Sequence, residues 1–189
     1  MTNIMINSET SKQHKQQALK KLNFAIYICS TSRYNQTKKE EEEKGEEQTL
    51  SDLGGDTIQE LIQTADHTVM YREILLDDKE MIAKALKNSL SRTDIDAIIF
   101  SGGTGIASTD VTIEAVTPLL EKTLPGFGEI FRHISYDSVG SSVVLSRAIA
   151  GVACGKAVFC IPGSPNAAKT AVEKLIIPET PHIIKHARE

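Results

Sequence analysis

The stretch Asp96-Ala97-Ile98-Ile99-Phe100-Ser101-Gly102-Gly103-Thr104-Gly105 decides the fold of this chain. Its first half is a short apolar run of strand length, and its second half is a glycine-rich turn that follows without a break. A continuous apolar run is typical of a strand that is covered on both faces. Glycines after such a strand let the backbone approach a ligand and present several N–H groups to it. The stretch therefore predicts a buried strand that ends in an anion-binding turn.

Strands and helices alternate on both sides of this stretch. Three further runs of strand character occupy residues 23–30, 68–75 and 157–161. Apolar residues at helical spacing lie between the strands, at 56–65, 81–90 and 111–121. This order indicates an α/β fold, in which a parallel sheet carries helices on both faces.

Four other segments receive a local prediction. Pro125-Gly126 is predicted to be a loop, and the small, apolar residues 139–152 are predicted to form a tightly packed helix. Ser164-Pro165 is expected to cap a helix that runs to about residue 177, and residues 179–189 to form an exposed helix. Residues 1–21 are polar and are expected to be a flexible extension of a single domain at 22–189. The acidic run at 40–47 is expected to be solvated, or else to begin an exposed helix.

Composition excludes several classes of protein. The net charge of −4 and the lack of a basic patch argue against nucleic-acid binding. No apolar run is long enough to span a membrane, and the polar N-terminus does not resemble a secretory signal, so we expect a cytoplasmic protein. The three cysteines are expected to be buried free thiols. The five histidines show no metal-ligand spacing by this reading, and no role is assigned to them.

Polar or small residues follow each predicted strand. They are Ser30-Thr31-Ser32-Arg33, Asp77-Asp78, the glycine turn, and Pro162-Gly163-Ser164-Pro165. Ligands of open α/β sheets bind outside the carboxyl ends of the strands. The four turns are therefore expected to converge on one binding site.

The residues of this edge leave its chemistry open. The turn Gly102–Gly105 matches neither the dinucleotide fingerprint nor the P-loop. Asp110 and Asp77 could each cap a helix, because aspartate is a common cap. Either could instead hold a divalent metal, since magnesium binds through one or two carboxylates together with substrate phosphates.

Several motifs together resemble the MoaB/MogA family of molybdenum cofactor biosynthesis. They are Ser101–Gly105, Asp110–Ala115, Pro125–Glu129, Gly140-Ser141-Ser142, Ser146-Arg147-Ala148 and Pro162–Pro165. The resemblance runs from about Asn23 to the C-terminus, and the single-domain MoaB branch matches best. It implies a three-layer α/β/α sandwich with a mostly parallel central sheet, and a homo-oligomer, either a trimer or a hexamer.

The resemblance also implies a reaction and its residues. Active members of the family bind molybdopterin and ATP and, with Mg²⁺, form adenylyl-molybdopterin and pyrophosphate. By position, Asp77 and Asp110 would be the catalytic and metal-binding carboxylates. Ser101, Gly102, Gly103, Thr104 and Gly105 would hold the nucleotide phosphates, and Ser30, Arg33, Gly163 and Ser164 would lie on the pterin side. Other proteins of the same pathway would be partners.

Two departures from the family pattern bear on activity. Thr109 stands where the family usually has arginine, and Leu75-Leu76-Asp77-Asp78 replaces Val-Pro-Asp-Asp. The first change removes a positive charge from the neighbourhood of the phosphates. The alternative to an adenylyltransferase is therefore a protein that binds or carries molybdopterin without catalysis.

Overall fold

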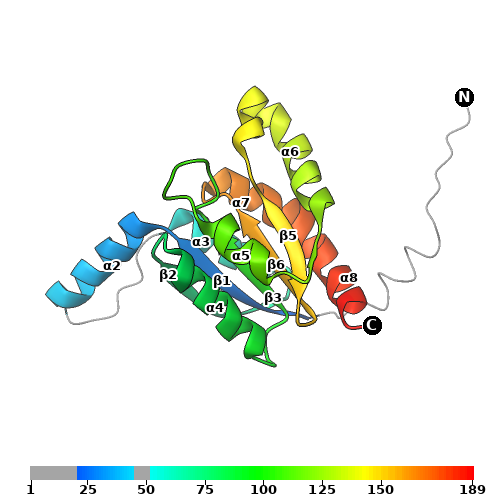
Figure 1. The fold of residues 1–189 in the computed structure, drawn as a ribbon, viewed down its shortest axis with the longest axis horizontal. Coiled ribbons are helices and arrows are strands. Elements are labelled where there is room, and N and C mark those ends of the chain that lie inside the picture. Colours follow the sequence, from blue (N-terminus) through cyan, green and yellow to red (C-terminus); the bar gives the residue numbers. More distant parts are fainter. Residues whose placement is uncertain (1–20, 45–51) are drawn as a thin grey trace, which may run out of the picture.

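The computed structural model describes residues 21–44 and 52–189, which form a single sheet flanked by helices (Figure 1). The strand order in this part of the chain is β2-β1-β3-β6-β5-β4. The strands are β1 (Asn23–Cys29), β2 (Thr68–Leu75), β3 (Ala97–Ser101), β4 (Lys122–Thr123), β5 (Ile149–Ala153) and β6 (Lys156–Ile161). The pairings of β1 with β2 and β3, and of β3 with β6, are parallel, whereas β5 pairs antiparallel with both β4 and β6. The predicted mostly parallel sheet is confirmed.

The interior strand β1 is buried on both faces, as its continuous apolar run predicts. Phe24, Ile26 and Ile28 point into one core cluster, and Ala25 and Tyr27 point into the other. Alternate residues of β3 and β6 divide between the same two clusters. The strand thus joins two separate cores across the sheet.

Helices cover both faces of the sheet. One face packs against α3 (Leu53–Thr64), α6 (Pro125–Val139), α7 (Pro165–Ala171) and α8 (Ile177–Ala187). The other packs against α4 (Lys79–Ser91) and α5 (Thr112–Val116). A further helix, α2 (Thr31–Lys44), extends from the carboxyl end of β1 (Figure 1). The three-layer α/β/α sandwich is therefore confirmed.

The segment between α5 and β6 differs from its prediction. Pro125 begins α6 and does not lie in a loop, because proline has no N–H to lose in the first turn of a helix. Residues 139–152 do not form a helix. A 3₁₀ segment, Gly140–Leu145, leads instead to β5. Cys154 and Gly155 adopt positive φ angles of 51° and 68°, which suits the tight turn between β5 and β6.

Two smaller predictions also change. Cys29 and Cys160 are buried, but Cys154 is exposed at the turn between β5 and β6. The C-terminal helix exists, but it is exposed on one side only, because Thr180 and Ile184 are fully buried against the core. Within the described ranges, no helix is long and apolar enough to cross a membrane.

The acidic run lies partly inside the described residues. Helix α2 continues through Glu40–Glu43 to Lys44, so the helical alternative holds for that part of the run. The rest of the run and the N-terminal extension up to residue 20 lie outside the described residues.

Candidate functional site

The sheet order places a site at the carboxyl ends of β1 and β3. The chain leaves β1 toward β2 on one side and returns to β3 on the other, so a crevice opens where the connections diverge. A cavity of about 450 Å³ lies there. Its walls come from four segments: Cys29, Ser30, Ser32 and Arg33; Gly102–Gly105 with Asp110; Leu145 and Ser146; Pro162 and Gly163. Three of the four turns expected to converge therefore border one cavity, whereas Asp77-Asp78 does not.

The glycine turn needs glycine at two positions. Gly102 has a φ of 103°, and a Cβ there would lie 2.3 Å from the carbonyl oxygen of Cys29. Gly103 has a φ of 60°, and its Cβ would lie 2.4 Å from the Oγ1 of Thr112. Thr112 in turn donates from Oγ1 to the Gly102 carbonyl (2.9 Å) and from its N–H to the Gly103 carbonyl (3.0 Å). The start of α5 thus holds the turn in its left-handed conformation.

Asp110 shapes the loop that follows the glycine turn, and its carboxylate borders the cavity. Its Oδ2 accepts a hydrogen bond from the N–H of Ala107 at 2.8 Å. A Cβ at Gly105 would lie 2.7 Å from the same oxygen, so the loop folds closely around the carboxylate. The carboxylate therefore both closes a turn and faces the space where a ligand would lie.

Arg147 fastens this loop from the other side. Its guanidinium donates to the carbonyls of Thr104 (Nε, 3.1 Å) and Asp110 (Nη2, 3.4 Å). It also pairs with Glu114 at 2.5 Å, and this hydrogen bond lowers the pKa of the glutamate. Arg147 is consequently occupied in holding the loop.

Asp77 lies beside the turn, outside the residues that border the cavity. Its Oδ2 accepts from the N–H (2.8 Å) and Oγ1 (3.0 Å) of Thr31, at the start of α2. A Cβ at Gly103 would lie 3.0 Å from its Oδ1, which therefore faces the glycine turn. The neighbouring Asp78 caps α4 by accepting from the N–H of Met81 at 2.7 Å. Asp78 is a cap, whereas Asp77 ties α2 to the glycine turn.

A buried carboxylate under the cavity was not singled out by the sequence. Asp52 precedes α3 and is 1% exposed, and its Oδ1 lies 2.8 Å from Nη1 of Arg33. Neither oxygen of Asp52 has a hydrogen bond of good geometry within the described residues. A Cβ at Gly55 would lie 2.4 Å from Oδ2, so only a glycine leaves room for this carboxylate. The ion pair with Asp52 holds Arg33 at the cavity wall.

A second cavity of about 710 Å³ adjoins the first, and Ser146 and Pro162 border both. Hydroxyl-bearing side chains line the second cavity: Ser135, Ser138, Ser142, Ser146, Ser164 and Thr170. The Oγ of Ser146 is buried and has no hydrogen-bond partner among the described residues. The site therefore has two adjacent compartments, with an unsatisfied hydroxyl between them.

The carboxylates beside the glycine turn fit a hard cation. Asp77 and Asp110 each engage Oδ2 in a protein hydrogen bond, which leaves Oδ1 of each as a donor atom within the described residues. Magnesium prefers such oxygens and takes only one or two of them when phosphates supply the rest. Three metal-ligating side chains do not cluster anywhere in the described ranges. The residues thus fit a magnesium ion that arrives with a phosphate ligand.

Cysteine chemistry does not belong to this site. Cys29 borders the cavity, but burial raises the pKa of its thiol to about 12. A thiol with such a pKa is a poor nucleophile at neutral pH. Cys29 is therefore not a candidate nucleophile of this site.

The structure brings together most of the residues predicted for the site. The main cavity contains Ser30, Arg33, Gly102, Gly103, Thr104, Gly105, Asp110 and Gly163. Ser101 is instead the buried end of β3, and Ser164 borders the second cavity. Asp52 and Ser146 are additions that the sequence reading missed as site residues. The pairing of an aspartate with Gly54-Gly55 at a helix start was the available signal for the first.

Comparison with known proteins identifies the family. The profile of a family described as "Probable molybdopterin binding domain" matches residues 25–182. The chain belongs to this family. The matched region of the chain includes every residue that borders either cavity, since these residues all lie between 29 and 170.

Relatives in the molybdopterin-binding family are similar over most of their length. Molybdenum cofactor biosynthesis protein B of Bacillus anthracis is 44% identical over 172 residues, which cover 90% of this chain and 94% of the relative. The protein of the same name from Staphylococcus aureus strain COL is 50% identical over 137 residues, 71% of this chain and 81% of the relative. The crystal structure of the tungsten cofactor synthesizing protein MoaB from Pyrococcus furiosus has a TM-score of 0.74 at 38% identity. The superposition covers 91% of this chain and 100% of the Pyrococcus furiosus chain.

Proposed function

We propose that this chain acts in molybdenum cofactor biosynthesis, where it binds molybdopterin and transfers AMP from ATP to the terminal phosphate of the pterin. The observation that carries the proposal is the pair of adjacent cavities that share Ser146 and Pro162 in their walls. One compartment has the glycine turn and Arg33, which suit phosphates, and the carboxylate of Asp110, which suits Mg²⁺. The other compartment has hydroxyls that suit a polar heterocycle. The family match and the names of its relatives support the same ligand.

The glycine turn suits phosphate groups. Backbone N–H groups of a turn with positive φ can point at a common centre and bind anions. Arg33, held by Asp52, supplies a positive charge at the opposite wall of the cavity. An arginine can bind phosphate oxygens through two parallel hydrogen bonds. These groups would offset the negative charge of a triphosphate and of an incoming phosphate monoester.

The proposed step is a single displacement at phosphorus. An oxygen of the pterin phosphate attacks the α-phosphorus of ATP, and a new P–O bond forms. The bond from the α-phosphorus to the bridging oxygen of the β-phosphate breaks, and pyrophosphate leaves with that oxygen. A phosphate monoester is largely dianionic at neutral pH, so the nucleophile does not depend on a protein base.

Positioning and charge neutralisation are what such a transfer asks of a protein. Asp110 at the cavity and Asp77 beside the turn would hold Mg²⁺, which would neutralise charge on the phosphates. Arg147 would contribute indirectly, because it fixes the loop that carries Asp110. Thr112 would act in the same way through the glycine turn.

The test is pyrophosphate release from the full chain mixed with molybdopterin, ATP and Mg²⁺. We expect release by the wild type and a loss of at least about 100-fold in Asp110→Asn, a scale typical of a lost electrostatic contact in catalysis. Asn can still accept the hydrogen bond from Ala107, so the loop should keep its shape. Release that persists at the wild-type rate in Asp110→Asn would contradict the assignment of Asp110.

A second function, a pterin-binding carrier without catalysis, is favoured by Thr109. This exposed residue brings no charge to the site, where the family usually has arginine. The carrier predicts that calorimetry detects molybdopterin binding without ATP binding and without pyrophosphate release. Restoring the charge with Thr109→Arg should then raise ATP affinity, whereas an active wild type would show ATP binding already.

The proposal includes a homo-oligomer. Large apolar side chains are exposed on α6 and the 3₁₀ segment after it: Ile130, Tyr136, Val139, Val144 and Leu145. Exposed apolar side chains that gather on one part of a surface often mark protein contacts. Light scattering should give a mass that is a multiple of the 20.7 kDa chain.

A further inference from the structure

We propose that His182 and His186 on helix α8 form a binding site for a divalent transition-metal ion, distinct from the cavity at the carboxyl edge of the sheet. The two residues are four positions apart, so their side chains lie one above the other on one side of the helix. The sequence reading overlooked this spacing. The structure makes it conspicuous, because the two rings meet edge to face with their centroids 4.7 Å apart.

The distance between the ring nitrogens carries the proposal. The Nε2 atoms of His182 and His186 are 3.0 Å apart. Without a metal, such a pair can share a proton. With metal–nitrogen bonds of about 2.0–2.1 Å, the same separation corresponds to an N–metal–N angle of about 90°, whereas a tetrahedral ion needs about 3.4 Å. The two nitrogens are therefore spaced as neighbouring ligands of a square-planar or octahedral ion.

A carboxylate lies near the Nδ1 of each ring. The Nδ1 of His186 lies 2.9 Å from Oε2 of Glu189, and the Nδ1 of His182 lies 3.6 Å from Oε2 of Glu179. A histidine that binds metal usually donates its other ring N–H to a carboxylate, which fixes the tautomer and raises the basicity of the ligating nitrogen. The contact of His186 with Glu189 has this arrangement, whereas the carboxylate of Glu179 lies near His182 at a distance too long for a hydrogen bond.

The helix that presents the pair is held at both ends of the stripe. Thr180 and Ile184, on the opposite side of α8, are completely buried. In the last turn, Arg188 donates to the carbonyl of Gly155 at 3.1 Å and pairs with Asp96 at 2.7 Å. The guanidinium is thereby drawn toward the sheet, and α8 keeps its helical form up to Ala187. The helix that carries the imidazoles is consequently held in place before an ion arrives.

The chemistry of the site selects its class of ion. Imidazole suits first-row transition metals, and a pair of neighbouring positions at about 90° suits Cu²⁺ and Ni²⁺ better than a tetrahedral ion. The side chains of His182 and His186 are 34% and 49% exposed, so water can occupy the other coordination positions. Hard cations such as Mg²⁺ prefer oxygen ligands and should not bind here.

The experiment titrates Ni²⁺ and Cu²⁺ into the untagged full chain by calorimetry. All proteins carry Cys154→Ser, because the exposed thiol of Cys154 could bind the same ions. We expect one ion per chain, and an affinity at least about tenfold weaker in His182→Ala and in His186→Ala, since each variant loses a ligand. Glu189→Gln should weaken binding by a smaller factor. His133→Ala, an exposed histidine of α6, is the control and should bind like the parent.

A spectroscopic readout separates this site from binding elsewhere. Electron paramagnetic resonance of the Cu²⁺ complex should show two coupled imidazole nitrogens in the parent and one in each single alanine variant. Alanine is the best helix former, so the variants should keep α8, and circular dichroism without metal verifies this. No saturable binding by the parent, or binding unchanged when both histidines are alanine, would overturn the proposal. Neither result would bear on pyrophosphate release.

Discussion

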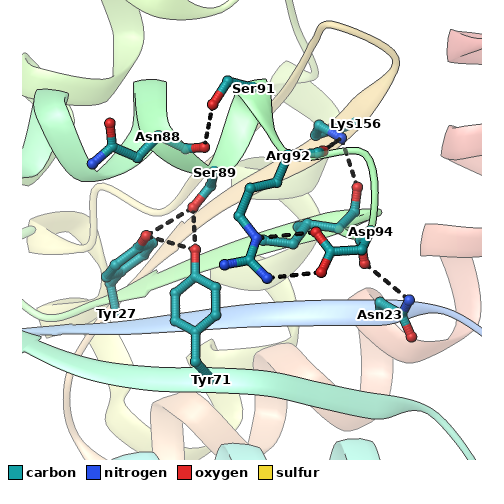
Figure 2. A network of polar contacts seen from close by, with 10 residues as sticks. Asn23, Tyr27, Tyr71, Asn88, Ser89, Ser91, Arg92, Asp94 and Lys156 are labelled. Atoms are coloured by element: carbon teal, nitrogen blue, oxygen red, sulfur yellow. Dashed lines mark hydrogen bonds and ion pairs between the residues drawn. The ribbon is translucent and has the colours of Figure 1, made fainter.

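Polar groups under α4 and at the amino edge of the parallel strands have hydrogen-bond partners in the protein, whereas some polar groups at the carboxyl edge lack them. Under the C-terminal part of α4, Tyr27, Tyr71 and Ser89 form a triangle of hydroxyl contacts of 2.6–2.8 Å (Figure 2). Lys156 donates to the carbonyls of Arg92 and Ile95 at 2.6 and 2.7 Å. At this edge, buried polar atoms have protein partners.

At the carboxyl edge, some buried polar atoms have no hydrogen bond within the protein. The hydroxyl of Ser146 is buried without a hydrogen-bond partner in the described residues, and the buried carboxylate of Asp52 has an ion pair with Arg33 but no hydrogen bond of good geometry. Two glycines hold left-handed conformations beside them. An unsatisfied buried group costs about 1–3 kcal/mol, and strained backbone adds to this cost. The polar groups under α4 and at the amino edge therefore stabilise the fold, whereas the carboxyl edge is arranged for a ligand.

The largest expected effect comes from the glycine turn. Gly102→Ala places a Cβ 2.3 Å from a backbone oxygen at a φ of 103°, so the turn must shift. We expect a loss of about 2–4 kcal/mol in the free energy of unfolding. Gly126→Ala is the matched control, because a Cβ there meets nothing within 4 Å. Chemical denaturation measures both, and equal losses would contradict the proposed strain.

The next effect concerns the ion pair below the cavity. Arg33→Ala leaves the carboxylate of Asp52 buried without a cation, and we expect it to cost about 1–3 kcal/mol. Asp52→Asn in the same chain should recover part of that loss, since the amide carries no charge. A double-mutant cycle by chemical denaturation gives the coupling. If the two changes are additive, the pair does not stabilise the protein.

A smaller effect tests the hydrogen-bonded hydroxyl triangle under α4. Tyr27→Phe removes one member of the hydroxyl triangle but leaves Tyr71 and Ser89 bonded to each other at 2.6 Å. We expect a loss of about 1 kcal/mol and no change in molybdopterin binding. Tyr136→Phe, on an exposed tyrosine, should change neither property. A defect of Tyr27→Phe in molybdopterin binding would contradict the conclusion that the hydroxyl triangle serves stability alone.

The smallest effect is a dependence of stability on pH. Burial lowers the pKa of His67 below its ordinary value of 6.5, and its Nδ1 accepts the N–H of Leu22 at 3.3 Å. As the pH falls below about 6.5, the unfolded chain takes up the proton first, so stability present above that pH is progressively lost. Denaturation midpoints at several pH values should fall less steeply for His67→Asn. Equal slopes would exclude His67 as a cause.

Strand and helix periodicity was enough to predict most of the fold. The strands β1, β2, β3 and β6 are buried or half-buried runs whose residue types match their places in the sheet. The prediction failed at β5, because a short apolar run of small residues fits a helix as well as a strand. In the structure, positive φ angles at Cys154 and Gly155 form a tight turn, across which β5 pairs with β6 as a strand.

The site was predictable in outline for a different reason. Turns after parallel strands must meet at one edge, so Arg33, Asp110 and Gly163 could be grouped from the sequence. Asp52 could not, because its position depends on how α3 packs over the sheet. The contact between His182 and His186 depends on rotamers that spacing alone does not determine.

The convergence of distant turns on one cavity also makes ligand binding a measure of the folded state as a whole. The walls come from segments near residues 30, 105, 145 and 163, so no contiguous fragment carries the cavity. A ligand bound there stabilises the native state by RT ln(1 + [L]/Kd), and that increment should protect β1 and β6 alike against hydrogen exchange. Occupancy of the site is, in effect, a report on the integrity of almost the entire chain.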